Sequence, residues 1–431
     1  MKKGITNSSA ALPVLAADLG TSPTISNLSV AMYMLAMSIF PLWWSSFSEL
    51  LGRRTVYLIS TALFIVSALV CALSSSAAML VVFRVLTGGA SASVQTVGAG
   101  TISDIWPSHQ RGTAFGAFYL GPLLGPMISP IVGGLLSQRF GWRSTMYFLA
   151  GYGALLWLML LLLLPETLPR PPADSSPALR DEDRSRRSAR LAKNMLIDPL
   201  GVILILRFPP VLLTVLVAAL AFGALFIVNV TIQQAFSAPP YVFSQRTVGL
   251  LYLPTGLGYF VAALLGGRWI DHIMARRARK ARRYDEKGRL VYLPEDRMGE
   301  NMWLANVIYP LGLLLFGWSI SFGLYWLVPS TGGFLFGLAS MMVFATSTTM
   351  LTEFVRKRSS TGVAVNNFVR NILSCVGTIV AAPWLDAIGP GYVFTAVALF
   401  CFVAGLGGIW VLGRNAGQWR RQMDEALNDG P

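Results

Sequence analysis

Apolar stretches long enough to cross a bilayer recur along the chain. Charge-free runs cover 27–48, 55–83, 85–103, 112–138, 144–165, 208–245, 247–267, 301–352 and 387–413. A bilayer core requires about 20 helical residues per crossing, so the 301–352 run holds two crossings, with a break near Ser321. One further segment, 361–385, carries a single charge, Arg370. The pattern predicts eleven transmembrane helices.

The composition excludes several other classes of protein. Hydrophobic residues make up 54% of the 431 residues and charged residues only 13%, with a mean hydropathy of +0.59. All three cysteines lie in apolar runs, which argues against a disulfide scaffold. A formal net charge of +14 could indicate nucleic-acid binding, but the chain is too apolar for a soluble nucleic-acid-binding protein. We therefore expect an all-α polytopic membrane protein without a nucleic-acid partner.

Lys and Arg residues concentrate in alternate connections between the predicted helices. The first, third, fifth, seventh and ninth connections and the tail, 414–431, together hold 27 of the 34 basic residues. Basic connections stay in the cytoplasm, so the C-terminus is predicted to be cytoplasmic. Eleven helices then place residues 1–26, an N-terminal remnant with Lys2 and Lys3, outside. Either the chain natively has eleven spans or its first helix is missing, and we favour the second.

Two long polar segments divide the chain. Residues 166–208, rich in Pro, Ser and Arg, form a predicted cytoplasmic linker between a five-helix bundle over 27–165 and a six-helix bundle over 209–413. A basic insertion, 268–300, interrupts the second bundle. Beyond setting topology, its arginines are expected to meet anionic lipid of the inner leaflet.

The two halves share a repeated pattern of charges. Ser45 and Glu49 are followed by Arg54 at the same spacing as Gly267, Asp271 and Arg276. Further along, Asp104 with Arg111 matches Glu353 with Arg358. Parallel repeats of this kind build some secondary transporters, with the substrate bound between the halves.

The motifs resemble the major facilitator superfamily. Its loop between helices two and three carries Gly, then Asp-Arg-x-Gly-Arg-Arg, and here Ser45 precedes Glu49-Leu-Leu-Gly52-Arg53-Arg54. Gly52 permits a tight turn, and the resemblance implies that the charges switch partners between conformations. The residues expected to act as this gating switch are Glu49, Gly52, Arg53, Arg54, Arg84, Asp104, Arg111, Asp271 and Glu353.

The resemblance extends to the fungal drug:proton antiporters with twelve spans. Arg84 with Gly88-Gly89 fits the fourth family helix, and an antiporter-type motif in the fifth comprises Gly121, Pro122, Gly125, Pro126, Ser129 and Pro130. Small residues four apart predict close helix packing there. Segments such as Tyr252-Leu-Pro-Thr-Gly256 and Asn366-Asn-Phe-Val-Arg370-Asn371 are similar to the quinidine-resistance and dityrosine-transporter group. The visible helices would then be family helices two to six and seven to twelve.

Polar residues within the apolar runs are the candidates for a substrate cavity. Arg370 lies near mid-membrane, and it shares one helix stripe with neighbouring asparagines, which must face a cavity or another helix. The cavity candidates are Gln95, Tyr119, Asn229, Gln233, Asn366, Asn367, Arg370 and Asn371. Structural helix-to-helix hydrogen bonding is the alternative role for each.

Enzyme chemistry and ATP-driven transport are not expected. His109 and His272 belong to no triad or metal-ligand spacing, and no lysine lies in a phosphate-binding loop. No cofactor is predicted, and a proton gradient is implied by the resemblance alone, because no Asp or Glu lies deep in a predicted helix.

The sequence thus predicts a monomeric, multi-pass secondary transporter. The resemblance implies proton-coupled efflux of drugs, organic ions or metabolites by alternating access, most readily across the plasma membrane, although an internal membrane such as the vacuole's remains open. One alternative is a facilitative or import carrier on the same fold. The other is a truncated, transport-incompetent membrane protein that senses or binds a partner.

Overall fold

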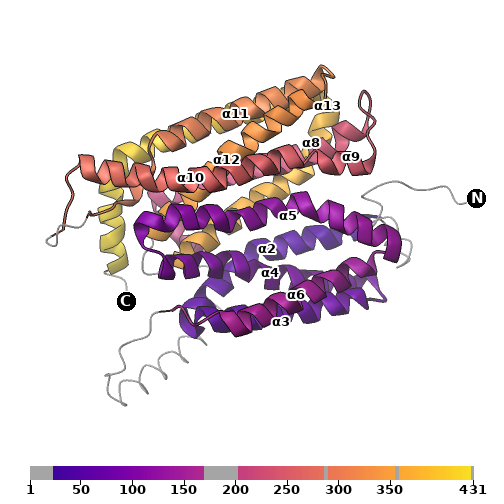
Figure 1. Cartoon of the computed structure of the whole chain (residues 1–431), viewed down its shortest axis with the longest axis horizontal. Coiled ribbons are helices and arrows are strands. Elements are labelled where there is room, and N and C mark those ends of the chain that lie inside the picture. Colours follow the sequence, from indigo (N-terminus) through magenta and orange to yellow (C-terminus); the bar gives the residue numbers. More distant parts are fainter. Residues whose placement is uncertain (1–22, 169–201, 286–289, 355–358, 429–431) are drawn as a thin grey trace, which may run out of the picture.

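The computed structural model describes residues 23–168, 202–285, 290–354 and 359–428, almost all of them helical (Figure 1). The N-terminal bundle comprises α2 (Pro23–Leu51), α3 (Arg53–Ala72), α4 (Ala77–Ile105), α5 (Arg111–Phe140) and α6 (Arg143–Leu163). The C-terminal bundle comprises α8 (Pro209–Ser237), α9 (Gln245–Leu250), α10 (Leu253–Lys280), α11 (Glu300–Ser321), α12 (Leu327–Phe354) and α13 (Ser359–Asn428). Three 3-10 turns are η2 (Ser108–Gln110), η3 (Leu204–Arg207) and η4 (Pro294–Arg297).

The prediction of an all-α, two-bundle membrane protein is confirmed. Within the described ranges, eight helical segments are long and apolar enough to cross a membrane, and α2 and α5 cover two further predicted spans with 29 and 30 residues. The long α13 contains the last two predicted spans, separated at Gly389, where φ is +76° and the helix kinks before Pro390. The 301–352 run breaks after Ser321, as predicted.

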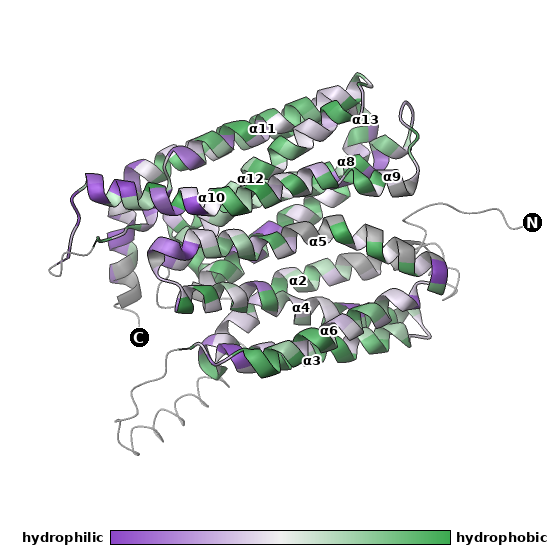
Figure 2. Cartoon of the chain, in the orientation of Figure 1, coloured by the Kyte–Doolittle hydropathy of each residue, from purple (hydrophilic) through white to green (hydrophobic). Residues whose placement is uncertain are grey.

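The two bundles lie side by side with their helices roughly parallel (Figure 1). They meet most extensively along two helix pairs, α5 with α10 and α2 with α13, and also where α13 contacts α4 and α12 contacts α5. Apolar residues run along the helices, and hydrophilic residues gather where α10 ends and α11 begins, at the left in Figure 2. We call this the basic end of the molecule, and the other the far end.

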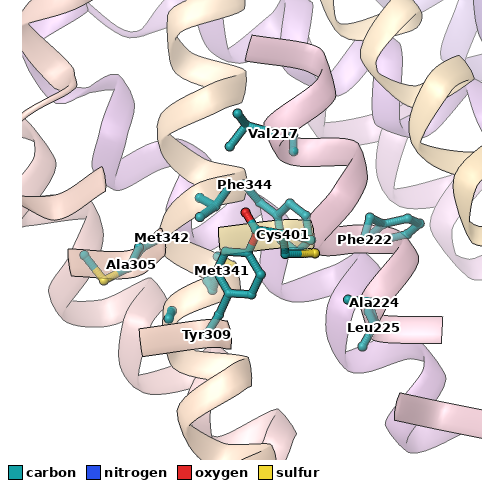
Figure 3. Packing of buried hydrophobic residues seen from close by; sticks show 14 of the residues in the cluster. Val217, Phe222, Ala224, Leu225, Ala305, Tyr309, Met341, Met342, Phe344 and Cys401 are labelled. Carbon is teal, nitrogen blue, oxygen red and sulfur yellow. The ribbon is translucent and has the colours of Figure 1, made fainter. Parts of the chain in front are cut away.

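Burial separates central from peripheral helices. The most apolar window of α12 is 83% buried, whereas that of α6 is only 17% buried. A core of aromatic and sulfur-containing side chains surrounds α12, including Phe222, Tyr309, Met341 and Phe344 (Figure 3). Because lipid tails accept exposed apolar side chains without cost, helices such as α6 can leave theirs uncovered.

Parts of the predicted domain organisation lie outside the described residues. These are the remnant up to residue 22, linker residues 169–201, part of the basic insertion, 286–289, and the end of the tail, 429–431. Arg358 of the charge repeat also lies outside the described residues. The first part of that insertion is helical, because α10 continues without a break to Lys280 and carries its basic side chains on a helix. The insertion then returns through η4 to the start of α11.

Candidate functional site

The α5–α10 contact joins the bundles at the basic end through Asp271. This carboxylate accepts hydrogen bonds from the backbone N–H groups of Gly112 and Thr113, both at 2.9 Å, and from the Thr113 hydroxyl at 2.8 Å. Gly112 and Thr113 form the first turn of α5, where N–H groups lack helical partners and the helix dipole favours an anion. Asp271 therefore caps a helix of the opposite bundle.

Small residues allow α5 and α10 to approach this closely. A Cβ at Gly116 would lie 2.9 Å from the Ala263 carbonyl oxygen, and one at Gly267 would lie 2.7 Å from the Thr113 Cα. Gly112 and Gly116 on one helix thus face Ala263 and Gly267 on the other, each pair four residues apart, which is the spacing for close helix crossing.

Arg297 of η4 connects this contact to the interior of the C-terminal bundle. Its side chain is fully buried and donates to Asp271 at 3.0 Å and to Glu353, at the end of α12, at 2.8 Å. Burial lowers the pKa of the Arg297 guanidinium, but the charges and hydrogen bonds of Glu353 and Asp271 outweigh burial, so its pKa lies above the ordinary value. One cation thus pairs with two carboxylates.

The N-terminal bundle has a corresponding buried arginine with a different partner set. Arg53 donates to Asp104 at 3.0 Å and to the Ser48 hydroxyl at 2.6 Å, both within its own bundle. Glu49 instead accepts from the hydroxyl of Thr361, at the start of α13, at 3.4 Å. Within the described ranges Arg53 does not bond Glu49, so the acid that pairs with Arg53 differs from the acid that contacts Thr361.

Gly52 places Arg53 at the start of α3. Its φ of +99° is a conformation that side chains rarely adopt, and a Cβ there would collide with Glu166. The Glu166 carboxylate accepts from the backbone N–H of Arg53 at 2.8 Å, and Arg54 donates to the Leu161 carbonyl at 2.8 Å. The end of α6 is thereby fixed to the turn between α2 and α3.

The remaining predicted switch residues have local contacts. Arg111 donates to the carbonyls of Ser103, at 2.7 Å, and Trp106, at 3.0 Å, which closes the end of α4. Arg84 is half-buried on α4, and its Nε is buried without a hydrogen-bond partner in the described ranges. The glycine that follows it by four residues, Gly88, packs against the Tyr33 backbone of α2.

A polar cluster lies between the bundles, deeper than the two end contacts. Arg370 on α13 donates to the Gln95 side chain on α4 at 2.6 Å, and its guanidinium lies 4.3 Å from the Phe222 ring centroid on α8. Tyr119 on α5 shares a hydrogen bond of 2.6 Å with Thr348 on α12. Five helices from both bundles contribute, and the structure therefore brings three predicted cavity residues, Gln95, Tyr119 and Arg370, together.

The predicted asparagines of α13 are all buried beside Arg370. Asn366 and Asn367 are each 1% exposed, and Asn371 is 9% exposed and donates to the Met37 carbonyl of α2 at 3.1 Å. In the described ranges, Asn366 Oδ1 and both polar atoms of the Asn367 amide have no hydrogen-bond partner. The Asn371 bond gives the α2–α13 contact a second point of attachment.

Other predicted residues lie outside this cluster. Asn229 and Gln233 are half-buried in the far half of α8, and the Asn229 carbonyl accepts from Tyr252. At Gly121 and Gly125 of the antiporter-type motif, a Cβ would meet no atom of the described residues within 4 Å, so close packing at these glycines stays a prediction. Close packing of α5 occurs nearer the basic end, at the glycines that face α10.

The charge repeat between the two halves did not identify several residues of these contacts. The charge spacing singled out Arg276, yet this arginine forms an exposed pair with Glu300, and Arg297 occupies the buried position. The sequence pattern also did not identify four uncharged residues of these contacts, which belong to no motif: Thr113, Thr348, Thr361 and Phe222. The available hint was the short segment Pro294-Glu-Asp-Arg297, in which an arginine follows two acids.

Together these contacts describe a molecule that is closed at the basic end. Both inter-bundle contacts place an acid of one bundle at the first turn of a helix in the other, and the polar cluster lies behind them. Carboxylates that bind helix N-termini can release them when the bundles separate, because water replaces the lost hydrogen bonds. The geometry suits two bundles that alternate between arrangements.

Comparison with known proteins agrees with this architecture. The model of the Major Facilitator Superfamily matches residues 4–378. MFS transporter OpS2 of Beauveria bassiana is 44% identical over 344 residues, which cover 77% of this chain and 98% of that protein. The MFS antiporter QDR3 of Candida albicans is 32% identical, covering 90% of this chain and 72% of that protein.

Solved structures share the fold at low sequence identity. The human organic anion transporter MFSD10 gives a TM-score of 0.65 at 19% identity, covering 93% of this chain and 89% of that one. The proton:xylose symporter XylE gives 0.64 at 15% identity, with coverage of 93% and 90%. The resemblance found in the motifs is thus confirmed, and this chain belongs to the Major Facilitator Superfamily, a family of multi-pass membrane transporters.

Proposed function

We propose that this protein is a secondary transporter that exports small organic molecules in exchange for protons, by alternating access between its two bundles. The observation that carries this proposal is the polar cluster around Arg370, buried between bundles that are held together at the basic end by Asp271 and Glu49. A site between the bundles becomes accessible from one side or the other according to which end separates.

Proton coupling is assigned to the carboxylates of the basic end. The apolar runs contain no Asp or Glu, so the acids nearest the cluster are those at helix ends, among them Asp271 and Glu353. A proton on Asp271 would remove the charge that binds the first turn of α5 and pairs with Arg297. Protonation would thereby favour separation of the bundles at this end.

Orientation and location are proposed on the same basis. Basic connections flank the ends of α2, α4, α10 and α12, so we place the basic end and the C-terminus in the cytoplasm. We further propose that the protein works as a monomer in the plasma membrane. The exposed arginines and lysine at the end of α10 would then meet anionic headgroups of the inner leaflet. These residues are Arg276, Arg277, Arg279, Lys280 and Arg282.

Reconstitution in proteoliposomes tests the transport proposal. We expect substrates from a panel of aromatic drugs and acids to move a pH-sensitive dye trapped inside the vesicles, and protein-free vesicles to show no response. Arg370→Ala should abolish the response while the protein still inserts. Wild-type flux in that variant would contradict the role of the cluster.

A facilitative carrier is the second candidate, favoured by the absence of an acid inside the apolar runs. The same vesicles separate the two functions. Substrate flux that is unchanged after an ionophore collapses the pH gradient would favour the facilitative carrier and exclude obligatory proton exchange.

A further inference from the structure

Arg370 differs from the other deeply buried arginines in its lack of an acidic partner. Arg53 and Arg297 are 2% and 0% exposed, and each forms an ion pair with a carboxylate. Arg370 is 1% exposed, yet no carboxylate pairs with it among the residues that the structure describes. A buried charge without a counter-charge is costly, and it persists where something compensates it during function.

The neighbours of Arg370 are neutral and leave part of the guanidinium unsatisfied. Gln95 accepts one hydrogen bond at 2.6 Å, and the rings of Phe222 and Tyr119 lie 4.3 and 5.7 Å from the guanidinium carbon. Aromatic faces attract a cation, but they accept no N–H in the plane of the guanidinium. Its Nε is buried with no hydrogen-bond partner in the described ranges.

Further unsatisfied polar atoms lie next to it. Asn366 and Asn367 precede Arg370 by four and three residues, so their side chains share its face of α13. One polar atom of Asn366 and both of Asn367 are buried without a partner in the described ranges. Each such group costs about 1–3 kcal/mol, so their concentration at one place suggests that a ligand satisfies them.

Aromatic side chains form the other wall of the cluster. Phe344 lies between Phe222 and Tyr119, with ring centroids at 5.7 and 6.4 Å, and Figure 3 shows Phe344 and Phe222 in the same buried core. This wall is aromatic and adjacent to the guanidinium. It suits an aromatic body attached to an acidic group.

A second arginine without an acid lies on the same face of α4 as Gln95. Arg84 precedes Gln95 by eleven residues, which is about three helical turns and about 16 Å toward the far end. Within the described ranges it has no carboxylate partner, and its Nε is unsatisfied. The two cations would attract an anion along this side of α4.

We propose, on the basis of the transport function proposed above, that the molecule carried is an organic anion with an aromatic body, whose carboxylate or similar acid group pairs with Arg370. The planar guanidinium binds such a group through two parallel hydrogen bonds, and the Asn367 amide N–H donates to it. The amide oxygens of Asn366 and Asn367 accept from hydroxyl or N–H groups elsewhere on the molecule. The aromatic body packs against Phe222, Phe344 and Tyr119.

Three naphthyl probes that differ in the terminal group test this inference: 1-naphthylacetate, the isosteric neutral 1-naphthylacetamide and the cationic 2-(1-naphthyl)ethylammonium. Binding to the purified full chain is measured in detergent by thermal stabilisation, and flux is measured in proteoliposomes. We expect the carboxylate to bind at least about tenfold more tightly than the amide or the amine, the difference expected from one charge-assisted pair. Equal or tighter binding of the amine, or no saturable binding of the carboxylate, would overturn the inference.

Variants at Arg370 complete the test. Arg370→Gln should lose the preference for the carboxylate, and Arg370→Lys, which keeps a cation, should retain it in part and shows whether the site still folds. Arg279→Gln, which removes an exposed arginine at the basic end, is the matched control and should bind all probes as the wild type does. A carboxylate preference that survives in Arg370→Gln would overturn the inference. Carboxylate binding without flux would contradict transport but support the site.

Discussion

Each half of this protein pairs acids at its helix ends with a buried arginine, but the arginine comes from a different place in the sequence. In the N-terminal half, Arg53 follows the acid Glu49 by four residues and pairs with Asp104 inside its own bundle. In the C-terminal half, Arg297 follows Asp271 by 26 residues, arrives from the basic insertion, and pairs with Asp271 and Glu353 together. The acids keep their repeated positions, whereas the source of the cation has changed.

This difference changes what each acid can do. Asp271 is shared between Arg297 and the first turn of α5, so breaking the inter-bundle contact and breaking the buried ion pair are coupled. Glu49 contacts Thr361 across the interface while Arg53 remains with Asp104. We therefore expect the α5–α10 contact to dominate closure at the basic end.

The largest effect is expected from Arg297→Ala. Its removal leaves Glu353 and Asp271 buried without a counter-charge, which costs about 3–5 kcal/mol of unfolding free energy. Denaturation of the purified protein in detergent measures this loss. The control is Arg276→Ala, whose pair with Glu300 is exposed to solvent and should contribute little to stability. Equal stability of the two variants would contradict the assignment of Arg297.

Asp271→Asn should open the basic end. The amide can still accept a hydrogen bond from α5, but it loses the charge that strengthens these bonds, a loss of about 2 kcal/mol, or about thirtyfold in the balance between closed and open states. Thr348→Cys, in a background without the native cysteines, reports opening through its rate of alkylation, because Thr348 is fully buried. Glu300→Gln, at the same end but outside the interface, should leave this rate unchanged.

Gly267→Ser tests whether the close crossing of α5 and α10 matters. The corresponding residue in the first half is Ser45, so the N-terminal contact already accommodates a side chain at this position. At Gly267 a Cβ would meet Thr113 and Gly112, which costs about 1–3 kcal/mol and separates the helices. The thermal midpoint should fall, whereas Gly121→Ser, whose Cβ has open space, should leave it unchanged.

The smallest effect is expected from Glu49→Gln. A glutamine oxygen can accept from the Thr361 hydroxyl as Glu49 does, and the Arg53–Asp104 pair is not touched. We expect less than about a fivefold change in the alkylation of Thr348→Cys. A change as large as that of Asp271→Asn would show that the two contacts are equivalent and that the comparison between the halves is wrong.

Much of the fold could be predicted because membrane spans are encoded locally. Each of the eleven predicted spans contains a helical segment, although 55–83 runs past the end of α3 into α4, 208–245 runs past the end of α8, and 247–267 covers α9 and the start of α10. The break after Ser321 and the division before Gly389 were visible as interruptions of an apolar run. Lipid imposes this correspondence, since every backbone group inside the bilayer must be paired within a helix. A polar interruption of an apolar run therefore marks the end of a helix.

The site could be predicted only in part. Polarity within an apolar run identified Gln95, Tyr119 and Arg370 one at a time, and the helix stripe placed the asparagines beside Arg370. The pattern did not separate these residues from Asn229, which has the same local signal but lies toward the far end of α8. What separates Asn229 from the cluster residues is its distance from the interface between the bundles. The periodicity of the sequence carries no information on that distance.

The sequence by itself determined the helices, the two halves and the repeated acids, because each depends on residue type and spacing along one segment. Only the tertiary structure decided which arginine is buried with Asp271 and Glu353, which helix end each acid caps, and that Arg370 faces Gln95 and aromatic rings without an acid. These are pairings between segments far apart in the chain. Ion pairs, caps and cavities depend on distances of a few ångströms, which are set when the bundles pack.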